Sequence, residues 1–452
     1  MISWARAFKI RQYLKGSLWV LPLGGCIVGV GAAQFSLALD QAVQLPPGWQ
    51  YSPSTASTVL ATVVGAMVAL LGFVVTVSVL VVQQATGTLS PRYMRLWYRD
   101  RLQKVVLASF AGTFTYAFSL LRRIESTFVP DIGVTVAGVA VATSLVLLLV
   151  YVNRFTHNLR PVAVAAAVAR VGQQALAIQA EALVGEPPDS IDRRPVGKPS
   201  ATIRTVGGGA IQAIAGKRLI EAAVRSDCVL VLIHGVGDFL PDDAAVIEVF
   251  GASPPQERLL RGLVATGTER TIEQDPAFAM RILVDIAIRA LSPAVNDPTT
   301  AVQVIDYIED FLHSLAALPL RPHYALTDSR GRTRLILPGR GWTEFLSLAV
   351  TEIRLYGETS PQVCRRLRAA LDGLRDGAPE EHRAAISSEL ATLDASLDRN
   401  FTDAAGRAFA GQSDRQGIGG RSREEEVAWA PTQRASGVGP GLATSGTITP
   451  PA

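Results

Sequence analysis

The sequence predicts a membrane protein in which a four-helix transmembrane bundle is followed by a mixed α+β, mainly helical cytoplasmic domain. Three observations lead to this fold class. Residues 1–155 carry long apolar runs between small clusters of charge, whereas residues 155–410 have the charge density of a soluble domain. The chain of 452 residues is long enough for both parts, at roughly 100–200 residues per domain. A run of aliphatic residues at 228–233 (CVLVLI) adds a strand signal to the second part.

Four segments of residues 1–160 are long and apolar enough to cross a bilayer, which takes about 20 residues of helix. None of them contains Asp, Glu, Lys, Arg or His. Basic residues gather before the first segment and between the second and third, while the loop 40–58 has none. Because basic loops stay in the cytoplasm, we expect a multi-pass inner (plasma) membrane protein with both termini cytoplasmic. The predicted spans are residues 17–39, 59–82, 105–121 and 132–152.

The leader before the first span predicts an anchor helix in the membrane interface. Trp4, Phe8, Tyr13 and Trp19 alternate there with basic residues, and aromatic side chains favour the headgroup level of a bilayer. We therefore expect the leader to contact the lipid bilayer.

The loop between the second and third spans, residues 89–104, predicts a second contact with the membrane surface. Its arginines are interleaved with aromatic and aliphatic residues. General anchoring to anionic headgroups is the simpler interpretation, and a specific lipid site is the alternative. The membrane-surface basic residues are Arg92, Arg95, Arg99, Arg101 and Lys104.

One face of the second span is small or mildly polar along its whole length. Positions spaced by alternating steps of four and three share one side of an α-helix. Close packing against a neighbouring helix is one interpretation, as for Gly25-x-x-x-Gly29 in the first span. A helix that lines a pathway or an oligomer axis is the other, and it predicts a homo-oligomer. The face consists of Thr58, Thr62, Gly65, Ala69, Gly72, Thr76 and Gln83.

The cytoplasmic half divides into several regions. A helix and a Pro-rich linker (161–201) precede a small β-module (202–254), and a mainly helical domain (255–404) precedes a tail (405–452) whose composition predicts disorder. Residues 234–249 (HGVGDFLPDDAAVIEV) resemble half of a barrel-sandwich hybrid domain, which implies a small β-barrel-like module. Asp243 stands where that motif has a second glycine, and no hairpin lysine is present for modification, so we expect no carrier function.

A group of polar residues surrounds one helix start in the helical domain. Pro298 suits a first helical position, and Asp297 before it suits an N-cap. Capping is the simpler interpretation, and a cytoplasmic site for a ligand or another domain is the alternative. The candidate polar site consists of Asn296, Asp297, Thr299 and Thr300.

The sequence offers no motif for catalysis, a cofactor or a metal. Cys26, Cys228 and Cys364 are far apart and form no ligand cluster with histidine. No serine, lysine or glycine-rich loop stands in a nucleophile or phosphate motif. The net charge of +4 comes without a basic stripe for nucleic acid. The uncharged spans argue against a proton-coupled pump.

Several motifs together resemble a known family. They are Leu89-Ser-Pro-Arg92, Arg99-Asp-Arg101, Gly112-Thr-Phe114 with Tyr116, the segment 269–276 (ERTIEQDP) and residues 291–301. Over roughly residues 1–360 the chain resembles the bacterial predicted membrane proteins catalogued as domain of unknown function 2254. There the β-module usually opens with Gly-Tyr-hydrophobic-Gln-x-Ile-Asp, whereas residues 209–215 (GAIQAIA) lack the Tyr and the Asp. The resemblance implies the topology and a bacterial inner membrane, and no established activity.

Two functions from different classes follow as hypotheses. The first is a homo-oligomeric channel-like conduit, lined by the second span and gated by the cytoplasmic domain. The second is a membrane-anchored scaffold whose cytoplasmic face binds a small molecule or a protein.

Overall fold

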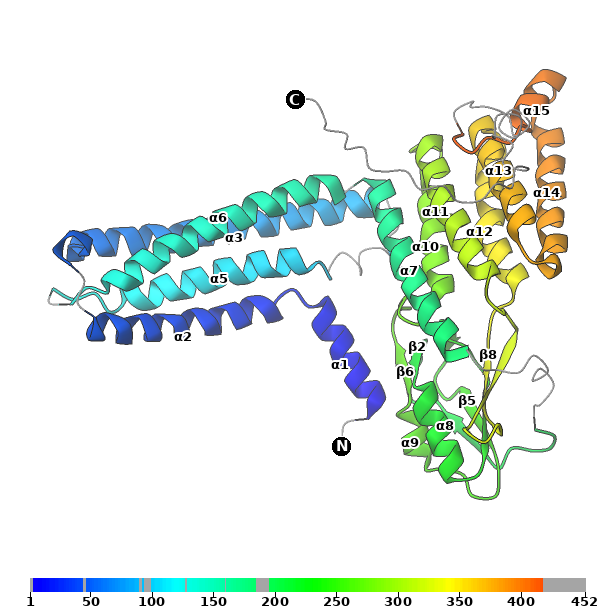
Figure 1. Cartoon of the computed structure of the whole chain (residues 1–452), viewed down its shortest axis with the longest axis horizontal. Coiled ribbons are helices and arrows are strands. Elements are labelled where there is room, and N and C mark those ends of the chain that lie inside the picture. Colours follow the sequence, from blue (N-terminus) through cyan, green and yellow to red (C-terminus); the bar gives the residue numbers. More distant parts are fainter. Residues whose placement is uncertain are drawn as a thin grey trace, which may run out of the picture.

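The computed structural model describes residues 3–43, 46–88, 92, 99–126, 128–158, 160–183 and 195–417. Within these residues the chain forms two parts that meet at a corner (Figure 1). One is an elongated group of apolar helices, which we call the apolar bundle: α2 (Val20–Ala42), α3 (Pro53–Thr88), α5 (Arg101–Leu121) and α6 (Asp131–Asn158). The other, the C-terminal part, comprises residues 161–417.

Helix α5 is the centre of the apolar bundle and packs against α2, α3 and α6. Its side chains Phe110 and Leu120 are fully buried. A Cβ atom on Gly25 would lie 2.3 Å from the backbone oxygen of Ala108, and one on Gly29 would lie 2.3 Å from that of Gly112. The prediction that Gly25 and Gly29 permit close packing is thus confirmed, since α2 and α5 approach backbone to backbone.

Among the described residues, five helices are long and apolar enough to cross a membrane: the four of the apolar bundle and α7 (Pro161–Leu183). The first four contain or overlap the predicted spans. Helix α7 packs instead on the helices of the C-terminal part, and its buried Val164, Val168 and Leu176 belong to their core. Its apolar composition is therefore accounted for by burial in protein.

The helices of the C-terminal part share one hydrophobic core with α7, in which Met280, Phe311 and Ile353 are fully buried. Helix α15 and the residues after it pack against α13, where Asp414 pairs with Arg365 at 3.2 Å. The predicted disorder is therefore wrong for residues 405–417, and residues 418–452 lie outside the described residues. These helices are α10 (Pro276–Ala290), α11 (Pro298–Ala316), α12 (Trp342–Gly357), α13 (Pro361–Gly377), α14 (Glu380–Asn400) and α15 (Ala404–Ala410).

Two sheets lie beside this core. The larger has the order β1-β5-β3-β8-β7 and the smaller the order β4-β2-β6. The strands are β1 (Ala201–Arg204), β2 (Gly209–Ile214), β3 (Val229–Leu232), β4 (Phe239–Leu240), β5 (Ala245–Phe250), β6 (Val264–Gly267), β7 (His323–Thr327) and β8 (Thr333–Pro338). The short helices α8 (Gly216–Arg225) and α9 (Glu257–Arg261) connect them, and α1 (Trp4–Gly16) and the 3-10 turn η1 (Pro47–Trp49) belong to the N-terminal region.

The predicted barrel-like module at 202–254 is corrected by this topology, because the described strands form no closed barrel. Strand β3 lies between β5 on one side and β8, paired in parallel, on the other. Its residues Leu230, Val231 and Leu232 are at most 4% exposed. A strand buried in this way needs a partner strand at both edges. The partner at the second edge is β8, which comes from a distant part of the chain.

Candidate functional site

The segment 269–276 between β6 and α10, which we call the junction segment, is fixed by a buried ion pair. Asp275 is 3% exposed and accepts hydrogen bonds from Arg270 at 2.6 and 3.0 Å. Its other oxygen accepts from the backbone N–H of Phe278 at 3.0 Å and so caps α10. Gly237 packs on this pair with a φ of +96°, and a Cβ there would lie 2.4 Å from the Asp275 carboxylate. Only glycine suits that position.

Two of the three carboxylates of the junction segment have pKa values that are shifted in opposite directions. Burial raises the pKa of Asp275, although Arg270 and, from farther away, Arg340 oppose the rise. Burial also acts to raise the pKa of Glu273, but Arg99 and Gln12 outweigh it, and the pKa of Glu273 is lowered. Glu273 is thus the group of the segment that is held as an anion by residues outside the C-terminal part.

Arg99, at the start of the α5 region, is the partner of Glu273 and links the apolar bundle to the junction segment. The Arg99 Nη1 and Glu273 Oε1 atoms are 2.5 Å apart, and each side chain is only 22% exposed. Arg99 also donates to the side chain of Gln12 in α1. The loop before α5 makes a second ion pair, between Arg92 and Asp285 of α10. Charged contacts therefore connect the chain before α5 with the junction segment and with α10.

Asp285 in turn continues the network into the helical core. Arg281 donates to Asp285 at 2.7 Å and to Glu352 of α12 at 2.8 Å. Arg281 thus forms a salt bridge between two helices, α10 and α12.

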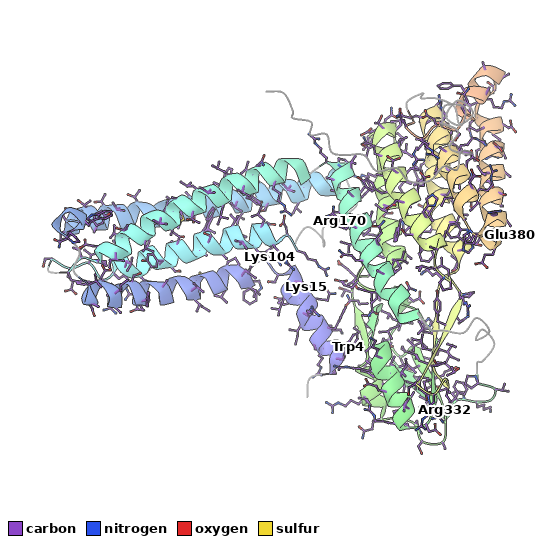
Figure 2. The ribbon with its side chains drawn as sticks, in the orientation of Figure 1. Trp4, Lys15, Lys104, Arg170, Arg332 and Glu380 are labelled. Carbon is purple, nitrogen blue, oxygen red and sulfur yellow. The ribbon has the colours of Figure 1, made fainter. Side chains whose placement is uncertain are left out.

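Helix α1 bridges the two parts at a second place. Its first turns lie on the β2–β6 sheet, where the Ala5 N–H donates to the Gly262 carbonyl at 2.9 Å. Trp4 and Phe8 stack at 5.5 Å and cover Ala213 and Ala265. Figure 2 shows Trp4 at the sheet end of α1 and Lys15 at the bundle end, close to Lys104.

The last turn of α1 meets the apolar bundle at that corner. The buried Lys104 donates to the Lys15 carbonyl. Tyr13 and Trp19 are 61% and 56% exposed. The predicted anchor helix is therefore half docked on protein, with its second pair of aromatic residues free to face a membrane.

The predicted membrane-surface basic residues have different environments. Arg92, Arg99 and Lys104 contact protein groups. Arg101 is exposed, and Arg95 lies outside the described residues. A lipid contact stays a prediction for this set.

A cavity of about 610 Å³ lies on the other side of the junction segment. This volume is in the range of small-molecule sites, roughly 300–1,000 Å³. The junction segment contributes Gln274, Asp275 and Pro276. Other walls come from α7, α8, the end of β2, the loop 235–238, β7, β8 and the start of α12. Gln274 also accepts from the Ile214 N–H at 2.9 Å, which holds the end of β2 at the cavity. Glu273 is thus the direct neighbour in the chain of a residue that lines the cavity.

All seven residues of the predicted second-span face are exposed, on the side of α3 that points away from the rest of the chain. The opposite side of α3 carries Leu60, Met67 and Val74, which are fully buried. No atom would contact a Cβ placed on Gly65 or Gly72. Within the described residues, then, Gly65 and Gly72 have no packing partner. The hydroxyls of Thr58, Thr62 and Thr76 donate to backbone oxygens four residues earlier in their own helix.

The four residues of the predicted polar site take separate roles. Asp297 caps α11 and accepts from the Thr300 N–H at 3.0 Å and from its hydroxyl at 2.6 Å. Thr299 accepts from Gln362 of α13 at 3.3 Å. Asn296 has a φ of +49° in the turn before the cap. None of the four lines the 610 Å³ cavity.

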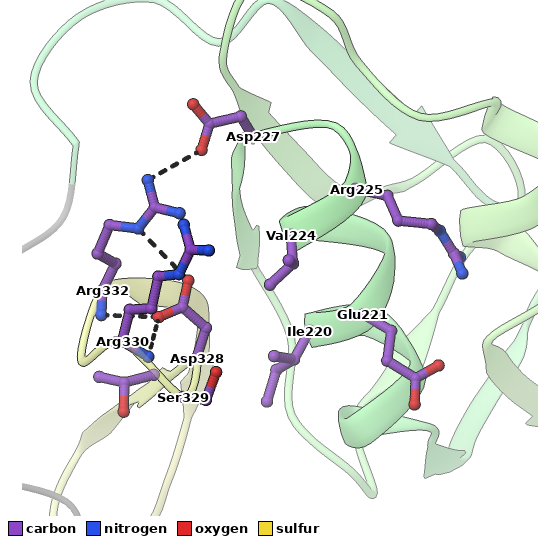
Figure 3. A pocket seen from close by; sticks show the side chains of 10 residues that line it. Ile220, Glu221, Val224, Arg225, Asp227, Asp328, Ser329, Arg330 and Arg332 are labelled. Carbon is purple, nitrogen blue, oxygen red and sulfur yellow. Dashed lines mark hydrogen bonds and ion pairs between the residues drawn. The ribbon is translucent and has the colours of Figure 1, made fainter.

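A second, open pocket lies between α8 and the β7–β8 turn (Figure 3). Asp328 accepts there from the backbone N–H groups of Arg330 and Arg332 and pairs with the buried Arg334 at 2.9 Å. The hydrogen bond from Arg334 lowers the pKa of Asp328 to about 2. Asp227 also pairs with Arg334, at 2.8 Å. These carboxylates already have arginine partners, and they hold the turn to the end of α8.

Sequence reasoning missed the cavity and the ion pairs of the junction segment. The sequence singled out residues 269–276 as a family motif but assigned their side chains no partner. No group of three His, Cys, Asp or Glu side chains in the described part of the chain is arranged to hold a metal.

Comparisons with known proteins agree with the apolar helices. A family model described as "Predicted membrane protein (DUF2254)" matches residues 15–373. The chain is 29% identical to uncharacterized protein Mb1321c of Mycobacterium bovis and to uncharacterized protein Rv1290c of Mycobacterium tuberculosis. Both alignments span 453 residues, 94% of this chain and 83% of the relative. No solved structure matches the chain significantly.

Proposed function

The chain belongs to the DUF2254 family of predicted membrane proteins, and we propose that it is a homo-oligomeric, channel-like conduit of the inner membrane. In this proposal the apolar bundle spans the membrane, and α3 lines the pathway or the oligomer axis. The C-terminal part and both termini are cytoplasmic, as the distribution of basic residues in the loops favours.

The observation that carries the proposal is the outward side of α3. A helix side that faces lipid is usually covered by large apolar residues, whereas small and hydroxyl side chains are used where helices meet or where water is present. The seven residues from Thr58 to Gln83 are exposed, and their side of the helix lies opposite the buried row of Leu60, Met67 and Val74. A second copy of the chain or a water-filled path suits this face better than lipid.

The junction segment suits a gating role for the C-terminal part. Glu273 is bonded to Arg99 of the bundle side, and the next two residues line the cavity. A ligand that moves the cavity wall therefore acts on residues directly next to Glu273 in the chain. Through Glu273 it acts on the ion pair with Arg99, just before the start of α5. This arrangement supports the proposal that occupancy of the C-terminal part is communicated to the membrane helices.

The test is flux of ions and small solutes across liposomes that contain the purified protein, under voltage, osmotic and pH gradients. Gly72→Leu places a large side chain on the proposed pathway and is expected to abolish the flux. Val75→Leu is the matched control, because Val75 is 52% exposed on the flank of the same helix turn. Absence of flux in the wild type, or equal flux in wild type and Gly72→Leu, would contradict the conduit.

A membrane-anchored scaffold that binds a small molecule or a protein is the second candidate, and the 610 Å³ cavity favours it. It differs from the conduit in requiring no flux. A wild-type protein that conducts nothing but binds a ligand in its C-terminal part would make the apolar bundle an anchor.

A further inference from the structure

Two cationic side chains line the 610 Å³ cavity without a hydrogen bond or an ion pair to any described residue. Lys217 lies in the first turn of α8, and Arg340 lies directly before Gly341, the N-cap of α12. Arg340 is half-buried and Lys217 is exposed. Arg340 acts on Asp275 only from a distance, and Asp275 is already bonded to Arg270. Both cations are therefore available to a ligand.

The carboxylates of the same cavity, in contrast, already have donors. Asp275 is bonded to Arg270. Glu344 accepts from the Gly341 N–H at 2.8 Å and completes the capping of α12. Asp238 accepts from the Gly235 N–H at 2.8 Å. Each of the three carboxylates at the cavity therefore has at least one donor inside the protein.

Helix α8 adds further donors at the cavity wall. Its first residues Gly216 and Lys217 line the cavity, and its N-cap residue, Ala215, has no side chain that accepts a hydrogen bond. The first backbone N–H groups of a helix have no partner inside it, and they carry the positive end of the helix dipole. The other two helices that begin here, α10 and α12, are capped by Asp275 and Glu344. The open helix start and the two unpaired cations thus belong to one cavity.

The rest of the wall is apolar. Helix α7 contributes Ile178, the sheets contribute Ile214, Leu326 and Leu337, and α12 contributes Phe345. Such a surface favours a hydrocarbon or aromatic body, while a few polar groups fix its orientation.

We propose that this cavity binds a phosphate ester with an apolar body, its phosphate held by Lys217, Arg340 and the first N–H groups of α8. A phosphate dianion matches two cations and a helix start in charge and in number of acceptors. The apolar body lies against α7 and the β7–β8 hairpin. This site is distinct from the α3 face and from Asn296–Thr300, and its occupancy does not depend on whether the bundle conducts.

The test is binding of phenyl phosphate to the full chain in lipid nanodiscs, measured by saturation-transfer NMR titration. We expect saturable binding of phenyl phosphate, at least tenfold weaker binding of phenol, and no saturable binding of benzylammonium. The double variant Lys217→Met and Arg340→Met is expected to weaken phenyl phosphate binding at least tenfold. Arg218→Met is the control, because Arg218 is exposed on the same helix and does not line the cavity.

Three results would overturn the proposal: no saturable phenyl phosphate binding, equal binding of phenol and phenyl phosphate, or an equal loss in Arg218→Met. The comparison of the three probes uses the wild-type chain alone, so it decides the question even if the double variant fails to fold. Flux is not part of the measurement, and its absence leaves the expected binding unchanged.

Discussion

Two sets of small residues in the apolar bundle have opposite surroundings. Gly25 and Gly29 of α2 lie so close to α5 that a Cβ would meet a backbone oxygen at 2.3 Å. Gly65 and Gly72 of α3 have no atom of the described residues outside their own helix backbone within 4 Å of the same position. The first set is used for packing inside the chain, whereas the second set shows no such use in the described part of the chain. Our proposal is that another molecule, a second copy or water, covers this side of α3.

The junction between the two parts resembles the contact of α2 with α5, because its groups already have partners inside the chain. We call such contacts closed. Arg99 and Glu273 bind each other, and Asp275 and Arg270 are buried together. Changes at closed contacts are expected to reduce the stability of the single chain, while changes on the open face of α3 are expected to leave that stability intact.

The largest expected effect is that of Asp275→Ala. Asp275 is 3% exposed. Removal of a buried partner from an ion pair costs about 3–5 kcal/mol, and α10 also loses its cap. Chemical unfolding of the C-terminal part in detergent, followed by circular dichroism, measures the loss. Asp275→Asn keeps a capping side chain and is expected to lose less; an equal loss in both variants would contradict the capping role.

A smaller loss is expected for Gly25→Leu. Overpacking costs about 1–3 kcal/mol, and more where a backbone blocks the new side chain, as Ala108 does here. Thermal unfolding of the solubilised chain is the measurement, with Gly72→Leu as the matched substitution. If Gly72→Leu lowered the melting temperature of the monomer as much as Gly25→Leu, the distinction between closed and open faces would be lost.

Glu273→Gln tests the contact between the two parts, with an expected cost of about 1–3 kcal/mol for a charged hydrogen bond. Because the pKa of Glu273 is lowered in the folded chain, its stabilising effect is present above the unfolded value of about 4.3 and is lost as the pH falls through the folded value. The difference in unfolding free energy between wild type and variant should therefore shrink as the pH falls below about 4. A difference that is constant from pH 7 to pH 3 would exclude the ionised pair as its cause.

The smallest effect on folding is expected for Thr62→Val. The Thr62 hydroxyl bonds only its own helix, and its side chain is exposed, so the unfolding free energy of the monomer should change by less than about 0.5 kcal/mol. The measurement is thermal unfolding at a detergent concentration that keeps the chain monomeric. A large loss would mean that the face has a partner within the chain.

The sequence was informative where the signal is local. Apolar runs without charge locate the helices of the bundle, and the spacing of Gly25 and Gly29 predicts the α2–α5 contact. Asp297 and Pro298 predict the start of α11, which begins at Pro298. In each case the residues that form the feature are neighbours in the chain.

The remaining features depend on contacts between distant residues. Strand β3 pairs with β8, so the β-module is part of a larger sheet and no closed barrel forms among the described strands. Glu273 finds Arg99, and Lys217 and Arg340 reach one cavity from different elements. The apolar character of α7 is typical of a membrane span, yet one face of the helix packs in the core of the C-terminal part. The charge and hydropathy of a segment predict that it needs a contact, but they do not identify the residues or the membrane that provide this contact.

The central claim, that the outward face of α3 meets a second copy, is tested most directly by disulfide cross-linking in membranes. Single cysteines are placed at Gly65, at Gly72 or, as a control, at Leu149, which is 70% exposed on α6, in a chain whose Cys26, Cys228 and Cys364 are changed to alanine. Under mild oxidation we expect a covalent dimer for the cysteines at positions 65 and 72 and none for the cysteine at position 149. No dimer at positions 65 and 72, or an equal amount at position 149, would contradict the claim.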